Sequence, residues 1–159
     1  MKNKLHKTNA ARHLDELHMP YELISYPVDE ENLSAVHVAQ SLGQNIDQVY
    51  KTLVLRGDKT GFFVCVIPGA AELDMKGAAR ASGNKSCEML HVKELVPVTG
   101  YMRGGCSPLG MKKPFPTYIH STCLDYPYIY ISAGQRGLLM KLAPADLIRE
   151  AKAEVCALF

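Results

Sequence analysis

The sequence predicts an α+β fold in which helices pack on one mixed, largely antiparallel β-sheet. Segments with helical spacing and segments with strand character occur in turn, but without the regular strand and helix alternation of a doubly wound parallel sheet. Residues 49–67 contain two strongly apolar runs separated by a turn-like segment, which indicates an antiparallel hairpin. With 159 residues and no linker, repeat or low-complexity run, we expect one domain over residues 1–159.

The helices are predicted from capping residues and apolar spacing. Ser34 can cap a helix with apolar residues at 35, 38, 39 and 42, and Gly43 stands where such a helix ends. The other expected helices are 9–17 (capped by Thr8 or Asn9), 75–82 (capped by Asp74, ended by Gly83) and 144–151 (begun by Pro144), with a helical turn at 92–95.

The strands are predicted from short runs rich in β-branched, aromatic and other apolar residues. A glycine-rich loop at 99–110 and a polar turn at 133–137 separate the later strands. The expected strands are 21–26, 49–56, 62–67, 85–89, 117–121, 128–132 and 138–142.

Charge and cysteine content exclude several classes. The 18 Lys and Arg against 16 Asp and Glu give a net charge of +2. Because this charge is small, binding of a nucleic acid would need a local patch of basic residues. The five cysteines are widely spaced and lack a CxxC, and Cys87 with His91 supplies too few ligands for a structural zinc site. We expect no metal and no cofactor. No segment reads as a membrane span or secretory signal, which favours a cytoplasmic protein.

Lys51 is the first candidate site residue. Period-two alternation places it on the same face of its strand as Val49, Leu53 and Leu55. A cation in an apolar row either faces a cleft or is an edge lysine whose stem packs while its ammonium reaches water. The pattern alone leaves both readings open.

The glycine-rich segment is the second candidate. Gly104 and Gly105 let the backbone approach a ligand closely, and consecutive N–H groups there can bind an anion or oxyanion. No Walker loop is present, and a plain tight turn is the alternative. The sequence shows no base that would activate Cys106, so we expect it to be a small buried side chain that packs in the core. Lys85, Lys112, Lys113, Arg103 and Arg136 are candidates for a basic rim around this loop.

Three segments together resemble the YbaK family of aminoacyl-tRNA deacylases. They are DQVYKTL at 47–53, GGCSPLGMKK at 104–113 and YISAGQRGL at 130–138. The resemblance runs from the first helix to about residue 151, with the three motifs in the family's order. The family is related to the editing domain of bacterial prolyl-tRNA synthetase, and the resemblance implies a barrel-like mixed sheet flanked by helices.

The resemblance also implies an activity. Members are free-standing trans-editing enzymes of protein biosynthesis that cleave the ester of mischarged tRNA, chiefly cysteine on tRNA(Pro). The implied route is attack by the substrate's own thiol, which releases a cyclic thiolactone and would class the enzyme as a lyase rather than a hydrolase. The implied partners are the acceptor end of aminoacyl-tRNA and prolyl-tRNA synthetase.

The family's functional positions can be placed on this chain. Lys51 matches the key functional lysine and is the expected catalytic residue. The residues expected to bind substrate are Tyr26, Thr52, Gly104, Gly105, Ser107, Ser132, Gly134 and Arg136. Because lowering the pKa of a lysine from about 10.4 to near 7 costs about 4 to 5 kcal/mol, a protonated Lys51 that anchors the carbonyl or a terminal phosphate is the cheaper role.

Two positions differ from close relatives, and both are expected to affect how the amino acid of the substrate is bound. Leu33-Ser34 stands where a phenylalanine is expected, and Leu139 follows the RGL element where an acidic residue can occur. Two alternatives to a Cys-tRNA(Pro) deacylase therefore stay open. One is an editing deacylase for another small amino acid, such as alanine on tRNA(Pro), and the other is a non-catalytic module that binds tRNA or a synthetase.

Overall fold

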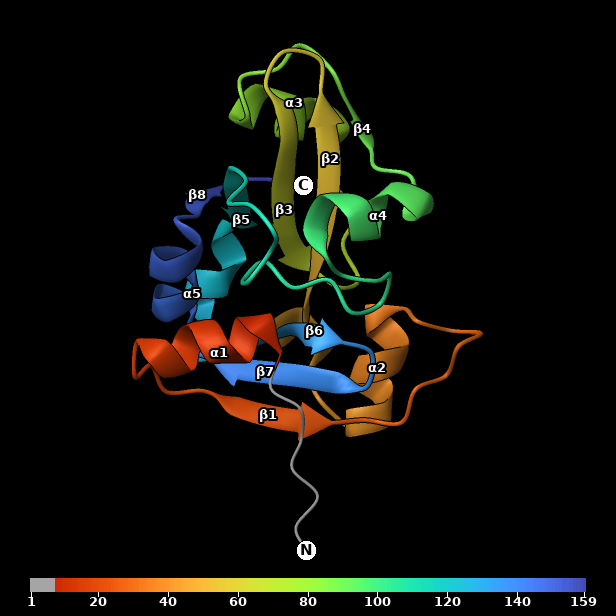
Figure 1. Cartoon of the computed structure of the whole chain (residues 1–159), viewed down its shortest axis with the longest axis vertical. Coiled ribbons are helices and arrows are strands. Elements are labelled where there is room, and N and C mark those ends of the chain that lie inside the picture. Colours follow the sequence, from red (N-terminus) through yellow and green to blue (C-terminus); the bar gives the residue numbers. More distant parts are fainter. Residues whose placement is uncertain (1–7) are drawn as a thin grey trace, which may run out of the picture.

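The computed structural model describes residues 8–159 (Figure 1). The start of the basic N-terminal segment, in which we expect no secretory signal, therefore lies outside the described residues. The helices are α1 (Asn9–Glu16), α2 (Ala35–Leu42), α3 (Met75–Ala81), α4 (Val92–Thr99) and α5 (Pro144–Ala151), with 3-10 turns η1 (Ile46–Gln48) and η2 (Ser121–Asp125). The strands are β1 (Glu22–Ser25), β2 (Tyr50–Gly57), β3 (Gly61–Pro68), β4 (Cys87–Met89), β5 (Thr117–His120), β6 (Ile129–Gln135), β7 (Leu138–Leu142) and β8 (Glu154–Cys156).

The strands form two sheets, so the mixed α+β class is confirmed while the expectation of one barrel-like sheet is wrong. A five-stranded sheet has the order β4-β2-β3-β5-β8, and a three-stranded antiparallel sheet has the order β1-β7-β6. In Figure 1 the strands of the smaller sheet run across those of the larger one. An isolated parallel bridge between Val49 and Tyr130 links them at one point, and no closed barrel forms among the described strands.

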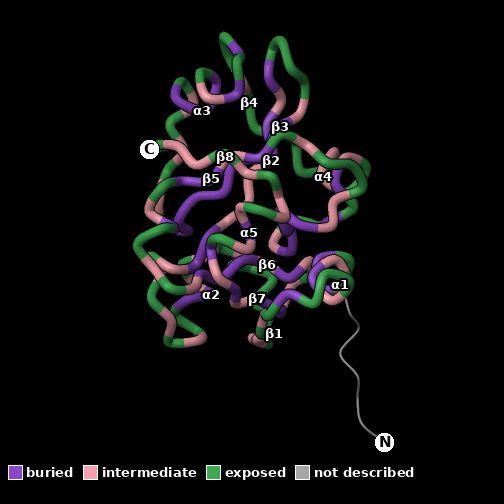
Figure 2. The backbone as a smooth tube through the Cα atoms, turned by 90° about the vertical axis from the view of Figure 1, so that its left-hand side faces the viewer, coloured by how far each residue is buried: buried purple, intermediate pink, exposed green. Residues whose placement is uncertain are grey.

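β3 is the central strand of the larger sheet and is covered on both faces. Val64 and Val66 belong to the main core, in which β2, β5, α1, α5 and the smaller sheet meet. Phe63, Cys65 and Ile67 point to the other face, where α3 and the C-terminal segment cover them. This alternation is what a strand buried on both sides requires. In Figure 2 the buried segments lie mostly inside the molecule, and the tip of the hairpin is exposed.

Local signals account for most element boundaries. Thr8 caps α1 by accepting from the N–H of Ala11, and Ser34 caps α2 by accepting from the N–H of His37. Gly43 ends α2 in the left-handed region at φ 64°. The predicted β2–β3 hairpin pairs Tyr50 with Pro68 through to Gly57 with Gly61.

The structure differs from the predicted elements in three places. α4 continues to Thr99 although Pro97 lies inside it, and the Thr99 hydroxyl donates to the Leu95 carbonyl in the last turn. β6 runs on to Gln135 through a shift in its pairing with β7, where a turn was expected. The three-residue β8 was not predicted. No helix within residues 8–159 is long and apolar enough to cross a membrane.

Candidate active site

A cavity of about 650 Å³ lies along β2, between the larger sheet and the smaller one. β2 and the residue before it line it over residues 49–54, and the segment leading into α2 lines it over 31–35. The remaining walls come from Tyr26, Val38, Met89, Leu90, Val92, Leu95, Arg103, Gly104, Cys106, Ser132 and Leu139. The cavity thus gathers segments from five separate parts of the chain.

The cavity exists because β4 is short. β4 pairs with β2 only from Leu55 to Gly57, and the N–H of Leu90 then donates to the carbonyl oxygen of Val54 at 3.0 Å. Beyond that bond the chain turns away into α4. Because residues two apart on a strand direct their main-chain groups to the same edge, Thr52 turns its N–H and C=O toward the side that β4 has left. A strip of main chain is therefore available along one wall.

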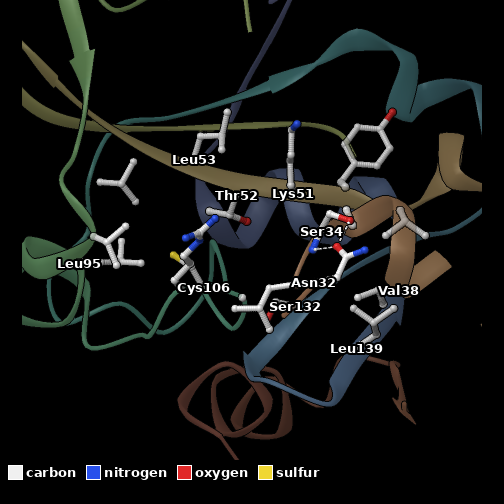
Figure 3. Close-up of a pocket in the computed structure, with 18 of the residues that line it drawn as sticks. Asn32, Ser34, Val38, Lys51, Thr52, Leu53, Leu95, Cys106, Ser132 and Leu139 are labelled. Atoms are coloured by element: carbon white, nitrogen blue, oxygen red, sulfur yellow. Dashed lines mark hydrogen bonds between the residues drawn. The ribbon is translucent and has the colours of Figure 1, made fainter. Parts of the chain in front are cut away.

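Lys51 lies at the middle of the β2 wall. It shares a face with Leu53, and both pack on the side of the second core, as the alternation predicts; Val49 precedes β2 and packs under α2 instead. Figure 3 shows Lys51 and Leu53 leaving the strand on one side and Thr52 on the other. Burial lowers the pKa of Lys51 below its ordinary value, and the nearby carboxylate of Glu72 opposes this effect.

Thr52 presents a hydroxyl without a partner. Its Oγ1 is buried and forms no hydrogen bond with any residue in the described part of the chain. A buried hydroxyl left unpaired destabilises a protein by about 1 to 3 kcal/mol. Since Thr52 lines the cavity, this unpaired hydroxyl is a candidate for ligand binding.

Five of the nine predicted site residues meet at the cavity. Besides Lys51 and Thr52, these are Tyr26 at the end of β1, Gly104 in the glycine-rich loop and Ser132 on β6. Gly104 has φ 84°, and a Cβ there would lie 3.3 Å from Leu33 Cδ1, so close packing and backbone conformation both favour glycine.

The other four predicted residues do not line the cavity, and they form hydrogen bonds within the loops around it. Gly105 donates its N–H to the Met102 carbonyl, so this group is not free for an oxyanion. Ser107 is buried and accepts from the N–H of Leu109. The Arg136 Nε donates to the Arg103 carbonyl at 2.7 Å, and Gly134 donates its N–H to Ser132 Oγ at 3.2 Å. These bonds fix the glycine-rich loop and the β6–β7 connection.

Sequence reasoning missed the apolar part of the site. Leu90, Val92 and Leu95 line the cavity, but their spacing is typical of an ordinary amphipathic helix and gives no sign of a pocket. Leu33 and Leu139, the two departures from close relatives, also line it. The basic rim is only partly assembled, because Lys85 lies beside Asp58 at the turn of the hairpin.

The cavity contains no activated nucleophile of its own. Burial raises the pKa of Cys106 to about 12, which keeps it as a thiol. No histidine is among the described residues that line the cavity. Residues 8–159 also contain no cluster of three or more His, Cys, Asp or Glu side chains that could hold a metal ion.

Comparison with known proteins assigns the family. Residues 29–150 match the aminoacyl-tRNA editing domain, which is most of the chain. The chain is also 51% identical over 142 residues to EbsC of Enterococcus faecalis (strain ATCC 700802 / V583), named as a candidate Cys-tRNA(Pro)/Cys-tRNA(Cys) deacylase. That match covers 89% of this chain and 87% of EbsC. The chain belongs to the aminoacyl-tRNA editing domain family.

Two solved structures agree in fold, and a further relative agrees in sequence. A crystal structure of a candidate trans-editing enzyme for prolyl-tRNA synthetase matches with a TM-score of 0.82 and 26% identity over 94% of both chains. The hypothetical protein APE2540 matches with a TM-score of 0.85 at 20% identity, over 95% of this chain and 99% of its own. The uncharacterized protein YwhH of Bacillus subtilis (strain 168) is 26% identical over 109 residues, 69% of each chain.

Proposed function

We propose that this protein is a free-standing deacylase that removes cysteine from mischarged tRNA(Pro). The 51% identity to EbsC supports the substrate, and the matched editing domain supports the reaction. We further propose that residues 1–159 act as one editing domain and that the protein works in the cytoplasm, where tRNA is charged.

The observation that carries the mechanism is a cavity whose described lining contains no activated nucleophile. Cys106 is held as a thiol, and the hydroxyls of Ser34, Thr52 and Ser132 have no histidine beside them in the cavity wall. An aminoacyl ester is already reactive, so orientation and charge stabilisation suffice if the nucleophile comes with the substrate.

A cysteinyl ester supplies that nucleophile. Its sulfur attacks the ester carbonyl carbon, the S–C bond forms as the C–O bond breaks, and the thiol proton ends on the departing 3′-oxygen of the tRNA. The products are a cysteine thiolactone and free tRNA, and water hydrolyses the thiolactone afterwards. No oxidant, metal or cofactor enters this balance.

The residues of the cavity bind the ester and stabilise the charge that develops on it. The Lys51 ammonium anchors the ester carbonyl or the terminal phosphate by charge. The Thr52 hydroxyl and main-chain groups hold the aminoacyl group from the β2 side, and the Gly104 backbone approaches it from the opposite wall. Charge developing on the carbonyl oxygen is thereby stabilised by groups already in place.

Selection of the tRNA needs more than this cavity. The net charge of +2 gives a weak general attraction for nucleic acid. We propose that prolyl-tRNA synthetase supplies the recognition of tRNA(Pro) by forming a complex with this protein. The relative of similar fold that is named for prolyl-tRNA synthetase supports this assignment.

Deacylation of a panel of charged tRNAs tests the proposal. We expect Cys-tRNA(Pro) to be cleaved much faster than Ala-tRNA(Pro), and Pro-tRNA(Pro) to survive. S-methylcysteinyl-tRNA(Pro) is the matched substrate without a free thiol, and we expect it to be cleaved about 100-fold more slowly. Faster cleavage of Ala-tRNA(Pro) would identify an alanine-editing enzyme, and tRNA binding with no cleavage would identify a binding module.

A further inference from the structure

The charges that line the cavity along β2 are unequal in number. Two cationic side chains line it, Lys51 and Arg103, and Glu31 is the one acidic side chain among the described residues of its wall. Because the two cations make the local potential positive, a further cation that enters the cavity is repelled unless a carboxylate faces it. Glu31 is therefore the residue of this wall that suits a positively charged part of a ligand.

The main chain holds Glu31 in a defined position, although it lies in a connecting segment. Its N–H donates to Asp29 Oδ1 at 3.0 Å, and the N–H of Asn32 donates to the Asp29 carbonyl oxygen at 3.0 Å. Ser34 then caps α2 by accepting from the N–H of His37. Figure 3 shows Asn32 and Ser34 at the cavity, joined by the bond from Ser34 Oγ to Asn32 Oδ1. These bonds tie the segment that carries Glu31 to the first turn of α2.

The carboxylate of Glu31 is not engaged in an ion pair. It forms none with any residue from 8 to 159, whereas Asp29 Oδ2 lies 3.6 Å from His37 Nε2. Glu31 and Asn32 are exposed, so this wall of the cavity opens to solvent. Because a charged group is costly to bury, a wall where it keeps part of its hydration is the favourable place to bind it.

The substrate of the proposed function carries one cationic group, the α-ammonium of the amino acid. The ordinary pKa of an α-amino group is about 7.7 to 8.0, so the group is protonated at pH 6. The cations Lys51 and Arg103 suit the carbonyl oxygen and the terminal phosphate of this substrate, but they repel its ammonium. Glu31 completes the match between the charges of the cavity and those of the ester.

We propose that the Glu31 carboxylate binds the α-ammonium group of the aminoacyl ester and so selects aminoacyl-tRNA against N-acylated tRNA such as peptidyl-tRNA. The inference rests on the proposed function, because it takes the ester from the substrate named there. Acylation converts the ammonium into a neutral amide, which removes the attraction and leaves the carboxylate without a cation. Glu31 is thus a specificity-determining residue that takes no part in breaking the ester bond.

Two neighbouring glutamates provide a matched pair of variants. Glu31→Gln removes the charge at the cavity and keeps the shape of the side chain. Glu30→Gln removes the same charge one residue away, from an exposed side chain that does not line the cavity. Each variant is assayed at pH 6.0 on Cys-tRNA(Pro) and on N-acetylcysteinyl-tRNA(Pro), which keeps the thiol and the ester but carries no α-ammonium.

We expect Glu31→Gln to raise KM for Cys-tRNA(Pro) about tenfold and to retain kcat, because the ammonium is bound equally in the ground state and the transition state. KM for N-acetylcysteinyl-tRNA(Pro) should be the same in wild type and Glu31→Gln. Glu30→Gln should match wild type on both substrates. An unchanged KM for Cys-tRNA(Pro) in Glu31→Gln, an equal loss on both substrates, or equal effects of the two variants would overturn the inference.

Binding without cleavage separates this inference from the proposed function. The probe is 3′-amino-3′-deoxyadenosine acylated with serine, an amide that has neither the labile ester nor a thiol. We expect wild type to bind it about tenfold more tightly than Glu31→Gln does, and to bind its N-acetyl form no more tightly than the variant. Equal binding of the probe by the two proteins, or no binding, would overturn the inference.

The two proposals can therefore fail separately. The expected binding together with no cleavage of any charged tRNA would support the role of Glu31 and contradict the deacylase. Cleavage of Cys-tRNA(Pro) with equal KM in wild type and Glu31→Gln would support the deacylase and contradict the role of Glu31.

Discussion

The N–H of Leu90 donates to the carbonyl oxygen of Val54 at 3.0 Å, and at this bond the chain leaves the edge of β2 and enters α4. The cavity begins where this pairing stops. A strand edge without a neighbour exposes main-chain donors and acceptors, which is a liability unless something covers or uses it. Here the cavity lies along that edge, and Thr52 combines main-chain groups directed to the edge with a buried hydroxyl that has no partner.

Replacing Thr52 with valine tests whether its hydroxyl serves the substrate. The variant keeps the shape of the side chain and removes a buried oxygen that has no partner. We expect the free energy of unfolding to rise by about 1 kcal/mol while kcat/KM for Cys-tRNA(Pro) falls about tenfold. Chemical denaturation and single-turnover deacylation measure the two quantities.

Thr99→Val is the matched control for Thr52→Val. The buried Thr99 hydroxyl donates to the Leu95 carbonyl at 2.7 Å, so its removal is expected to lower the free energy of unfolding by about 1 kcal/mol. Loss of stability in both variants would mean that the Thr52 hydroxyl has a structural role after all.

Gly105→Ala tests whether Gly105 is required for packing. A Cβ at this position would lie 2.9 Å from the Gln135 Cα, which is main chain and cannot move aside cheaply. We expect a loss of about 1 to 3 kcal/mol in the free energy of unfolding and a fall in deacylation, because the loop that carries Gly104 is displaced.

The control for Gly105→Ala is Gly61→Ala, at the turn of the β2–β3 hairpin. Gly61 has φ 77° and nothing within 4 Å of a new Cβ, so only backbone strain of about 1 to 2 kcal/mol is expected. Its deacylation should remain normal. Unchanged stability of Gly105→Ala would refute the close contact between the loop and the β6–β7 connection.

His120 is expected to make stability depend on pH. Its Nδ1 accepts the N–H of Leu158 at 3.0 Å, and its ring stacks on Phe159. Burial lowers the pKa of His120 below its ordinary 6.5, so around that pH the unfolded chain binds more protons here than the folded protein. The contribution of His120 is complete above the ordinary pKa and is lost as the pH falls through it toward the folded value.

Denaturation at pH 7.5 and at pH 5.5 measures this effect. The wild type should lose stability by up to about 1.4 kcal/mol per pH unit relative to His120→Asn, whose side-chain oxygen can accept the same bond without titrating. Equal pH dependence of the two proteins would contradict the assignment.

Much of the fold was predictable because its signals are local. Thr8, Ser34 and Gly43 stand at helix ends where their side chains or backbone conformations satisfy terminal groups. The division into two sheets was not predictable, since it depends on the parallel pairing of β3 with β5, more than 50 residues apart in the chain. The three residues of β8 are too few to show any alternation.

The site was predictable where a charged residue occurs in an otherwise apolar strand. Lys51 is a cation in an apolar strand, which by itself makes it a candidate, and it lies on the same side of β2 as Leu53, as predicted. Gly105 belongs to the same motif as Gly104, but only the packing shows that its N–H is used internally. Val92 and Leu95 line the site with side chains that are equally suited to a core, so their sequence pattern carries no functional signal.

The rate of Cys-tRNA(Pro) deacylation by Lys51→Ala tests the central claim most directly. If Lys51 anchors the ester or its phosphate by charge, kcat/KM falls by about 100-fold or more in Lys51→Ala, the fold is retained, and Lys51→Arg recovers part of the loss. Full activity of Lys51→Ala on Cys-tRNA(Pro) would contradict the account.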